Sequence, residues 1–350
     1  MSAFAWLGER ISYPWPETGE DPLKVGPKLW KLAQAGAAVM GDTFPITWAD
    51  DGEMYTSSGD PYWGGKEGGL DVETFVGDAP RYDIRRVSAM PGYDGNAGEG
   101  PKPSGMICAG GVLYLAFQNL LGKKPPAHGE ASQHGSDAVV VSSKDHGATW
   151  TPPIRDLKAP FFPGCEFGGP AFVNFGRDNE GARDGFVYAV SADQWDNGSH
   201  LRLGRVPRDR ITDPAAWEWA GAGGEGGPRW TARLAEAVPV LSRDRHISLP
   251  EMVCVGRRRY LLLTWRLNRD YTFDAGSRLM IYRASEPWGP FTLLHEEEWE
   301  SAEVTPYCPR LPLKWLRRTD DGVDGWLQFS GRPGSHYYRS HVRRFRLRLA

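Results

Sequence analysis

Two aspartates flank the first strong turn signal of the chain at equal distances, and both follow a glycine. Asp42 precedes and Asp60 follows the turn residues Asp50, Asp51 and Gly52. A hairpin about this turn returns Asp60 to the edge from which Asp42 starts, and paired strands lie about 4.8 Å apart. Two carboxylates about 5–5.5 Å apart suit a glycosidase that retains anomeric configuration, with one nucleophile and one acid/base. Aspartates that follow glycine also commonly cap loops, so the spacing alone leaves both interpretations open.

Further polar side chains lie just before the other predicted hairpins, beside glycine or proline. Glu166 and Glu251 are candidates for a third carboxylate or for binding sugar hydroxyls, and the alternative is hydrogen bonding at a strand end. His246 either contacts a sugar or an ion or is structural. Arg310 either neutralises the aspartates, binds substrate or forms a structural ion pair. The expected substrate-binding set is Lys102, Ser104, Glu166, His246, Glu251, Tyr307 and Arg310.

The elements that must position these residues follow from a pattern that occurs five times. An apolar run leads into a turn rich in glycine or aspartate, and an aromatic residue opens the next apolar run, which is a hairpin signature. The pattern recurs about every 68 residues, as expected of repeated β-sheet units. We expect inner hairpins centred near residues 51, 110, 180, 257 and 320, with the aromatic markers Tyr55, Tyr114, Tyr188, Tyr260 and Trp326.

Two more strand-like runs follow each hairpin, which makes about four strands per unit. Four-stranded antiparallel sheets repeated in this way are typical of a propeller, where radial packing protects most strand edges. The sequence therefore predicts an all-β fold, a five-bladed β-propeller in a single domain over residues 1–350. The alternating run 342–349 is expected to pair with an N-terminal segment, so that the extension 1–35 closes the ring, and residues 27–36 predict one short helix.

Two segments have the composition of known loop motifs. Residues 143–150 read Ser-Lys-Asp-His-Gly-Ala-Thr-Trp and resemble the Asp-box hairpin of sialidase-like propellers, in which aspartate and glycine form the turn. Residues 221–227 are rich in glycine. They lack the Lys-Ser/Thr ending and the following helix of a phosphate loop, so we expect a flexible loop there.

Composition excludes several classes of function. Lys and Arg number 41 and Asp and Glu 44, which gives a formal net charge of −3. The chain therefore has no excess of basic residues that would bind the phosphate backbone of nucleic acid. The four cysteines form no Cys-x-x-Cys pair, and the histidines at 128, 134 and 146 lack metal-ligand spacing, so we expect no metal and no cofactor. Without a signal-peptide pattern or an apolar run of about 18 residues, we expect a cytoplasmic monomer with no membrane segment, exported only if its native N-terminus was trimmed.

The run 41–60 carries a family resemblance, because Thr-Trp-Ala-Asp-Asp-Gly and Tyr-Thr lie between its two Gly-Asp pairs. It resembles the first blade of a bacterial five-bladed β-propeller glycoside hydrolase family that includes the endo-D-arabinanases. The segments 102–106, 167–176, 181–184, 203–211 and 312–315 resemble that family in order and spacing, and the similarity spans about residues 36–350. The resemblance implies a five-bladed propeller in which Asp42 is the acid/base and Asp60 the nucleophile.

The leading hypothesis is a retaining glycoside hydrolase whose oligosaccharide or polysaccharide substrate contains a furanose, as D-arabinan does. A first alternative is a non-catalytic propeller that binds carbohydrate or protein. A second alternative is a polysaccharide lyase, which needs groups that neutralise a uronate and abstract a proton; His246, Tyr307 and Arg310 are the candidates for that set.

Overall fold

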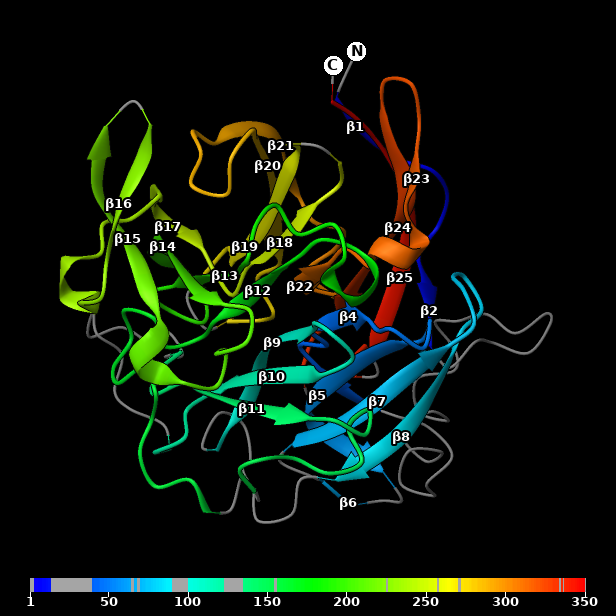
Figure 1. Cartoon of the computed structure of the whole chain (residues 1–350). Coiled ribbons are helices and arrows are strands. Elements are labelled where there is room, and N and C mark those ends of the chain that lie inside the picture. Colours follow the sequence, from blue (N-terminus) through cyan, green and yellow to red (C-terminus); the bar gives the residue numbers. More distant parts are fainter. Residues whose placement is uncertain are drawn as a thin grey trace.

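The computed structural model consists of strands, turns and four short 3-10 turns, with no α-helix in the part of the chain that it describes (Figure 1). It describes residues 3–13, 40–63, 66–67, 70–89, 100–122, 135–153, 156–224, 226–256, 258–269, 272–333, 335 and 337–349. The short helix expected over 27–36 lies outside these residues. Within them, no helix has the length and apolar character needed to cross a membrane.

Antiparallel pairing divides the described strands into five groups that follow one another along the chain. The first two groups are β3 (Met40–Asp42), β4 (Ile46–Trp48), β5 (Met54–Trp63), β6 (Lys66–Glu67), β7 (Leu70–Val76) and β8 (Asp83–Ala89), then β9 (Lys102–Cys108), β10 (Leu113–Gln118) and β11 (Val139–Ser143). The third is β12 (Ala171–Asn174), β13 (Phe186–Ala192), β14 (Gly198–Pro207), β15 (Glu218–Gly224), β16 (Gly227–Thr231) and β17 (Leu241–Ile247).

The fourth and fifth groups complete the chain. The fourth is β18 (Glu251–Cys254), β19 (Tyr260–Leu267), β20 (Ser277–Ala284) and β21 (Thr292–Glu298). The fifth is β22 (Tyr307–Arg310), β23 (Arg317–Arg318), β24 (Gly322–Ser330) and β25 (Ser340–Arg348), together with the N-terminal strands β1 (Phe4–Trp6) and β2 (Ile11–Ser12), which both pair with β25. The C-terminal run therefore pairs with an N-terminal segment.

All five predicted inner hairpins are present. Their strand pairs are β4 with β5, β9 with β10, β12 with β13, β18 with β19, and β22 with β24. The second turn shows the local cause most clearly, because Gly110 and Gly111 have φ values of 67° and 72°. Two successive positive φ values suit the tight turn whose twist matches the flanking strands, and glycine adopts them without steric cost.

The groups differ from the expected uniform four strands. The second has three strands in the part of the chain that the structure describes, and the third has six. A short parallel ladder pairs Val173 with Met252, and it joins the third and fourth groups into one ten-stranded sheet. The expectation of a flexible loop at 221–227 was wrong, because Gly224 pairs with Gly227 in the hairpin β15–β16. The preceding residues Trp219 and Ala220 pair with Thr231 and Trp230, which extends this hairpin.

Five apolar clusters fill the spaces between successive strand groups. Four lie between the first and second, second and third, third and fourth, and fourth and fifth groups. A fifth packs Phe44 and Phe75 of the first group against Trp315 and Val342 of the last. Successive side chains of a strand point to opposite faces of its sheet, and here apolar residues lie on both faces. Each sheet therefore packs against a neighbouring sheet on both sides. The two ends of the chain are thus joined both by β25 and by a shared core.

Candidate active site

The first hairpin carries both aspartates, but its register changes before it reaches them. Trp48 pairs with Met54 at the turn, and an unbroken ladder would place Asp42 opposite Asp60. Asp42 instead lies opposite Gly59, and Asp60 adopts a φ of 44°. A left-handed residue at such a register shift redirects a side chain that regular alternation would send to the other face. Asp60 is therefore turned by a local irregularity rather than by the ladder itself.

Gly59 allows the charged groups to meet. A Cβ atom on Gly59 would lie 2.6 Å from Oδ1 of Asp42 and 3.2 Å from Cδ of Lys102. The carboxyl group of Asp42 would have to move and the Lys102 stem would have to shift slightly, so these two groups occupy the space that a side chain at residue 59 would take. The residue that admits this approach directly precedes Asp60.

Asp42 is buried and carries a strongly raised pKa. Only 8% of the residue is exposed, and the hydroxyl of Tyr307 donates a hydrogen bond of 2.8 Å to Oδ2 of Asp42. Burial is the largest cause that raises the pKa of Asp42 to about 7, and the charge of Asp60 is the second. The hydrogen bonds from Tyr307 and Tyr338 and the charge of Lys102 lower it. A carboxyl group with this pKa is partly protonated at neutral pH, as a general acid must be.

Asp60 is held differently. The ammonium Nζ of Lys102 lies 2.6 Å from Oδ1 of Asp60, and both side chains are largely buried, with 4% and 13% exposed. An ion pair of this kind stabilises the carboxylate form. Two largely buried carboxyl groups on one hairpin therefore have unlike partners, since a phenol binds Asp42 and an ammonium group binds Asp60.

Arg310 and Glu251 form a separate buried ion pair, which contacts the backbone directly after Asp42. Nε of the fully buried Arg310 donates to the carbonyl of Thr43 at 2.8 Å, and Nη1 donates to the carbonyl of Pro250 at 3.1 Å and to Oε2 of Glu251 at 3.2 Å. Burial raises the pKa of Glu251 to about 7 although Arg310 lowers it. The contacts of Arg310 thus join the first, fourth and fifth strand groups, which favours the structural ion pair among its alternatives.

The other three predicted residues either have partners elsewhere in the fold or are exposed. The buried hydroxyl of Ser104 donates to the carbonyl of Pro170 at 2.9 Å. Glu166 is exposed in the loop before β12. Nδ1 of His246 lies 2.5 Å from the carbonyl of Asp244 and its Nε2 lies 3.4 Å from Nη1 of Arg266. Burial lowers the pKa of His246, and nearby arginines lower it further.

The site includes groups that the sequence analysis did not select. The hydroxyl of Tyr338 donates to the carbonyl of Gly59 at 3.2 Å, and Tyr338 also lowers the pKa of Asp42. Tyr338 lies two residues before β25, outside the segments that precede the predicted inner hairpins. For Gly59 the sequence does contain a signal, because a glycine next to a functional side chain in a strand often marks a place where other groups approach the backbone closely.

Metal chemistry has no support from the described side chains. No group of three or more His, Cys, Asp or Glu residues in the described ranges has an arrangement that could hold a metal ion. The chemistry available at Asp42 and Asp60 is instead proton transfer and nucleophilic attack by carboxyl groups.

Comparison with known proteins gives structural likeness without sequence likeness. The sequence matches no model of a known protein family and no curated protein. An α-L-arabinofuranosidase from Podospora anserina, solved with cellotriose, has 12% identity and a TM-score of 0.51, covering 98% of both chains. The catalytic domain of an α-L-arabinofuranosidase from Coprinopsis cinerea has 12% identity and a TM-score of 0.52, also covering 98% of both chains. A provisionally assigned hydrolase from Bacteroides ovatus has 14% identity and a TM-score of 0.57, covering 96% of this chain and 93% of the other.

These likenesses extend over nearly the whole chain and concern the fold. The chain is an all-β protein with the fold of propeller hydrolases. At 12% identity, the comparison assigns no role to any single residue of this chain.

Proposed function

We propose that this protein is a retaining glycoside hydrolase with a five-bladed propeller fold, and that its substrate is a glycan containing furanose units, as in D-arabinan. The observation that carries the proposal is the unlike state of two neighbouring carboxyl groups. Asp42 has a pKa raised to about 7, and Asp60 is paired with Lys102 at 2.6 Å. A retaining glycosidase needs one protonated carboxyl group as the acid and one ionised carboxylate as the nucleophile, and two different environments provide this difference.

In the proposed reaction the Asp60 carboxylate attacks the anomeric carbon while Asp42 donates its proton to the departing glycosidic oxygen. The bond from the anomeric carbon to that oxygen breaks, and an ester bond to Asp60 forms. Water then attacks the anomeric carbon, the ester bond breaks, and Asp42 accepts the proton of the water. Two inversions leave the product with the configuration of the substrate.

The electrostatics of the pair support this change of role. The charge of Asp60 is the second-largest cause that raises the pKa of Asp42. That charge disappears when Asp60 forms the ester, while the charge of Lys102 remains and lowers the pKa of Asp42. Asp42 is therefore a stronger acid in the second step than in the first, so it is ionised when it must act as a base.

The five-blade architecture is supported by the five inner hairpins and by the five apolar clusters between successive groups. A furanose-containing substrate is supported by the resemblance of residues 41–60 to the family that includes the endo-D-arabinanases, and by the arabinofuranosidases among the structural neighbours. The lyase alternative is less well supported. The hydroxyl of Tyr307 donates a hydrogen bond to Asp42 and its pKa is raised by burial, whereas Nε and Nη1 of Arg310 bind Thr43, Pro250 and Glu251.

The test is a screen of the purified protein on D-arabinan, L-arabinan, arabinogalactan and xylan, followed by time-resolved NMR of the first product from any hydrolysed glycan. We expect cleavage of a furanose-containing glycan with retained anomeric configuration. An inverted product would refute the mechanism. Binding without turnover across the panel would favour a carbohydrate-binding protein, and an unsaturated product would identify a lyase.

A further inference from the structure

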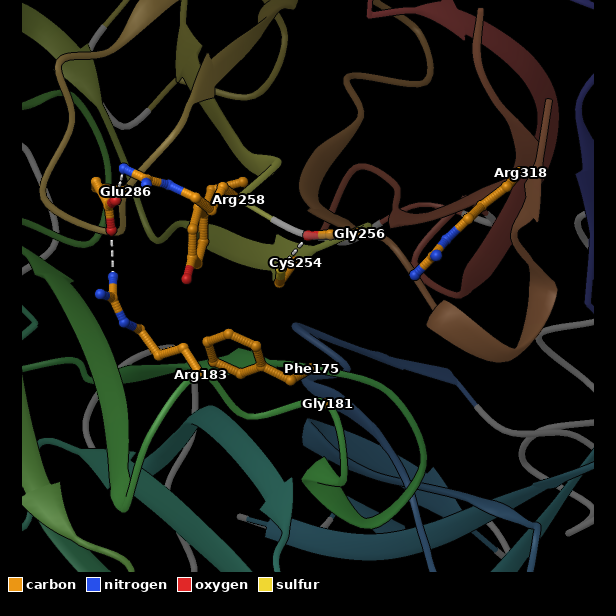
Figure 2. Close-up of a pocket in the computed structure, with 9 residues that line it drawn as sticks. Phe175, Gly181, Arg183, Cys254, Gly256, Arg258, Glu286 and Arg318 are labelled. Atoms are coloured by element: carbon orange, nitrogen blue, oxygen red, sulfur yellow. Dashed lines mark hydrogen bonds and ion pairs between the residues drawn. The ribbon is translucent and has the colours of Figure 1, made fainter. Parts of the chain in front are cut away.

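A cavity of about 500 Å³ lies beside the ends of the inner strands β12 and β18 (Figure 2). Glu251 begins β18 and binds Arg310, which contacts the carbonyl of Thr43 directly after Asp42, whereas Cys254, the last residue of that strand, lines the cavity. Phe175, which follows the last residue of β12, lines it as well. A volume of this size matches small-molecule sites, and the length of the strand separates this cavity from the proposed chemistry.

The charged groups that line the cavity are mainly basic. Figure 2 shows Arg183 and Arg258 on one side, both bound to Glu286, and Arg318 on the other. Among the described residues that line the cavity, Glu286 is the single acidic one, so these side chains carry an excess of two positive charges. Asp184, at 3.3 Å from Nε of Arg183, reduces that excess to one when it is counted. An acceptor with more than one negatively charged oxygen would complement this excess.

Arg318, whose side chain is exposed, is the arginine of this lining set that does not bind Glu286. Within the described ranges no carboxylate pairs with Arg318, whereas its neighbour Arg317 pairs with Asp324. Gly256 contributes to the same space, because a Cβ atom there would lie 3.6 Å from Cζ of Arg318. The guanidinium of Arg318 therefore lies beside a hairpin turn that carries no side chain at that position.

Two further lining groups stay neutral and add no negative charge. Burial raises the pKa of Tyr260 to about 12, so its hydroxyl remains a hydrogen-bond donor at neutral pH. Burial raises the pKa of the Cys254 thiol, and its Sγ lies 2.8 Å from the carbonyl of Gly256. The cavity thus combines guanidinium donors and a phenol with one carboxylate.

We propose that this cavity binds the phosphate group of a small organic phosphomonoester. Guanidinium groups present planar pairs of donors that match phosphate oxygens, and a phosphomonoester carries between one and two negative charges near neutral pH. The cavity volume also leaves space for the organic part of such a molecule. The inference is independent of the proposed glycosidase activity.

The test is calorimetric titration of the full chain with glucose 6-phosphate, with glucose, inorganic phosphate and citrate as parallel titrants. We expect glucose 6-phosphate to bind, inorganic phosphate to bind more weakly and glucose to give no heat. Arg318→Gln should weaken binding about tenfold or more, because a hydrogen bond between charged groups is lost. Arg317→Gln removes the same charge from the same strand and should leave the affinity unchanged.

Three results would overturn the proposal. They are the absence of binding by glucose 6-phosphate, equal weakening by Arg317→Gln and Arg318→Gln, and tighter binding of citrate than of glucose 6-phosphate. The first shows that the cavity does not bind a phosphomonoester, the second indicates non-specific attraction by surface charge, and the third indicates a carboxylate site. Asp60→Asn should leave the titration unchanged, and a changed titration would place the ligand at the aspartates instead.

Discussion

The hydroxyl of Tyr307 lies 2.8 Å from Oδ2 of Asp42, and the contact is buried and spans 265 residues of sequence. Tyr307 begins the inner strand of the fifth group and Asp42 ends β3 of the first. The hydrogen bond therefore joins the first and the last strand groups at the carboxyl group of the proposed acid. The contact between these two groups thus affects the protonation state of Asp42.

Replacing either aspartate should abolish most turnover. We expect Asp42→Asn to lower kcat about 10²–10⁴-fold, since it removes the proton donor. A substrate with an activated aryl leaving group needs no proton in the first step, so it should restore ester formation in Asp42→Asn but not in Asp60→Asn. Steady-state and burst kinetics measure this difference. Equal restoration in both variants would contradict the assigned roles.

Tyr307→Phe should move the alkaline limb of the pH–rate profile to higher pH. The hydrogen bond from Tyr307 lowers the pKa of Asp42, so its loss raises that pKa above about 7 and keeps the acid protonated further into the alkaline range. Tyr55→Phe is the matched control, because it removes a phenol-to-carboxylate hydrogen bond of 2.7 Å to Asp51 at the other end of the same hairpin. An alkaline limb that stays in place or moves down would argue against Asp42 as the acid.

Lys102→Met should lower kcat and shift the same limb upward. The substitution removes the ion pair with Asp60 and the positive charge that lowers the pKa of Asp42. We expect a loss of stability of about 1–3 kcal/mol in urea unfolding, since a buried ion pair loses one partner. Lys144→Met, at an exposed lysine, is the control for loss of charge. Unchanged kcat in Lys102→Met would refute a role for the ion pair.

Gly59→Ala should lower the rate of the reaction strongly and the stability of the fold only slightly. The added methyl group would approach Oδ1 of Asp42 to 2.6 Å, so the carboxyl group or the Lys102 stem must move. Gly185→Ala is the control, because a Cβ atom there meets no other heavy atom within 4 Å. Activity assays and thermal unfolding of both variants check this expectation, which fails if Gly59→Ala retains the wild-type rate.

Glu251 should make stability depend on pH. Its pKa rises from 4.5 in the unfolded chain to about 7 in the folded protein, so folding binds a proton between these values. The contribution is fully present below about pH 4.5 and is lost as the pH rises through 7. Relative to wild type, Glu251→Gln should lose about 2 kcal/mol less free energy of unfolding between pH 5 and 8. Glu180→Gln, at an exposed position, is the control, and equal slopes for wild type and Glu251→Gln would contradict the expectation.

The sequence by itself was enough to locate the five inner hairpins and the aspartate pair. Hairpins are encoded locally, by turn residues such as Gly110 and Gly111 and by the apolar runs on either side. The two Gly-Asp pairs flank one such turn, so their placement on the same hairpin also follows from short-range pattern.

The tertiary structure decided what distinguishes the two aspartates. Lys102 lies 42 residues from Asp60, and Tyr307 lies 265 residues from Asp42, so neither partner can be read from local spacing. The register shift at Asp60 occurs where non-glycine residues adopt positive φ values, and the residue types at these positions do not by themselves predict that conformation. The separation of Arg318 from any described carboxylate likewise depends on which strands meet at the cavity. Burial and charge act through space, and this is why the acid, the ion pair and the basic cavity became visible only in the folded chain.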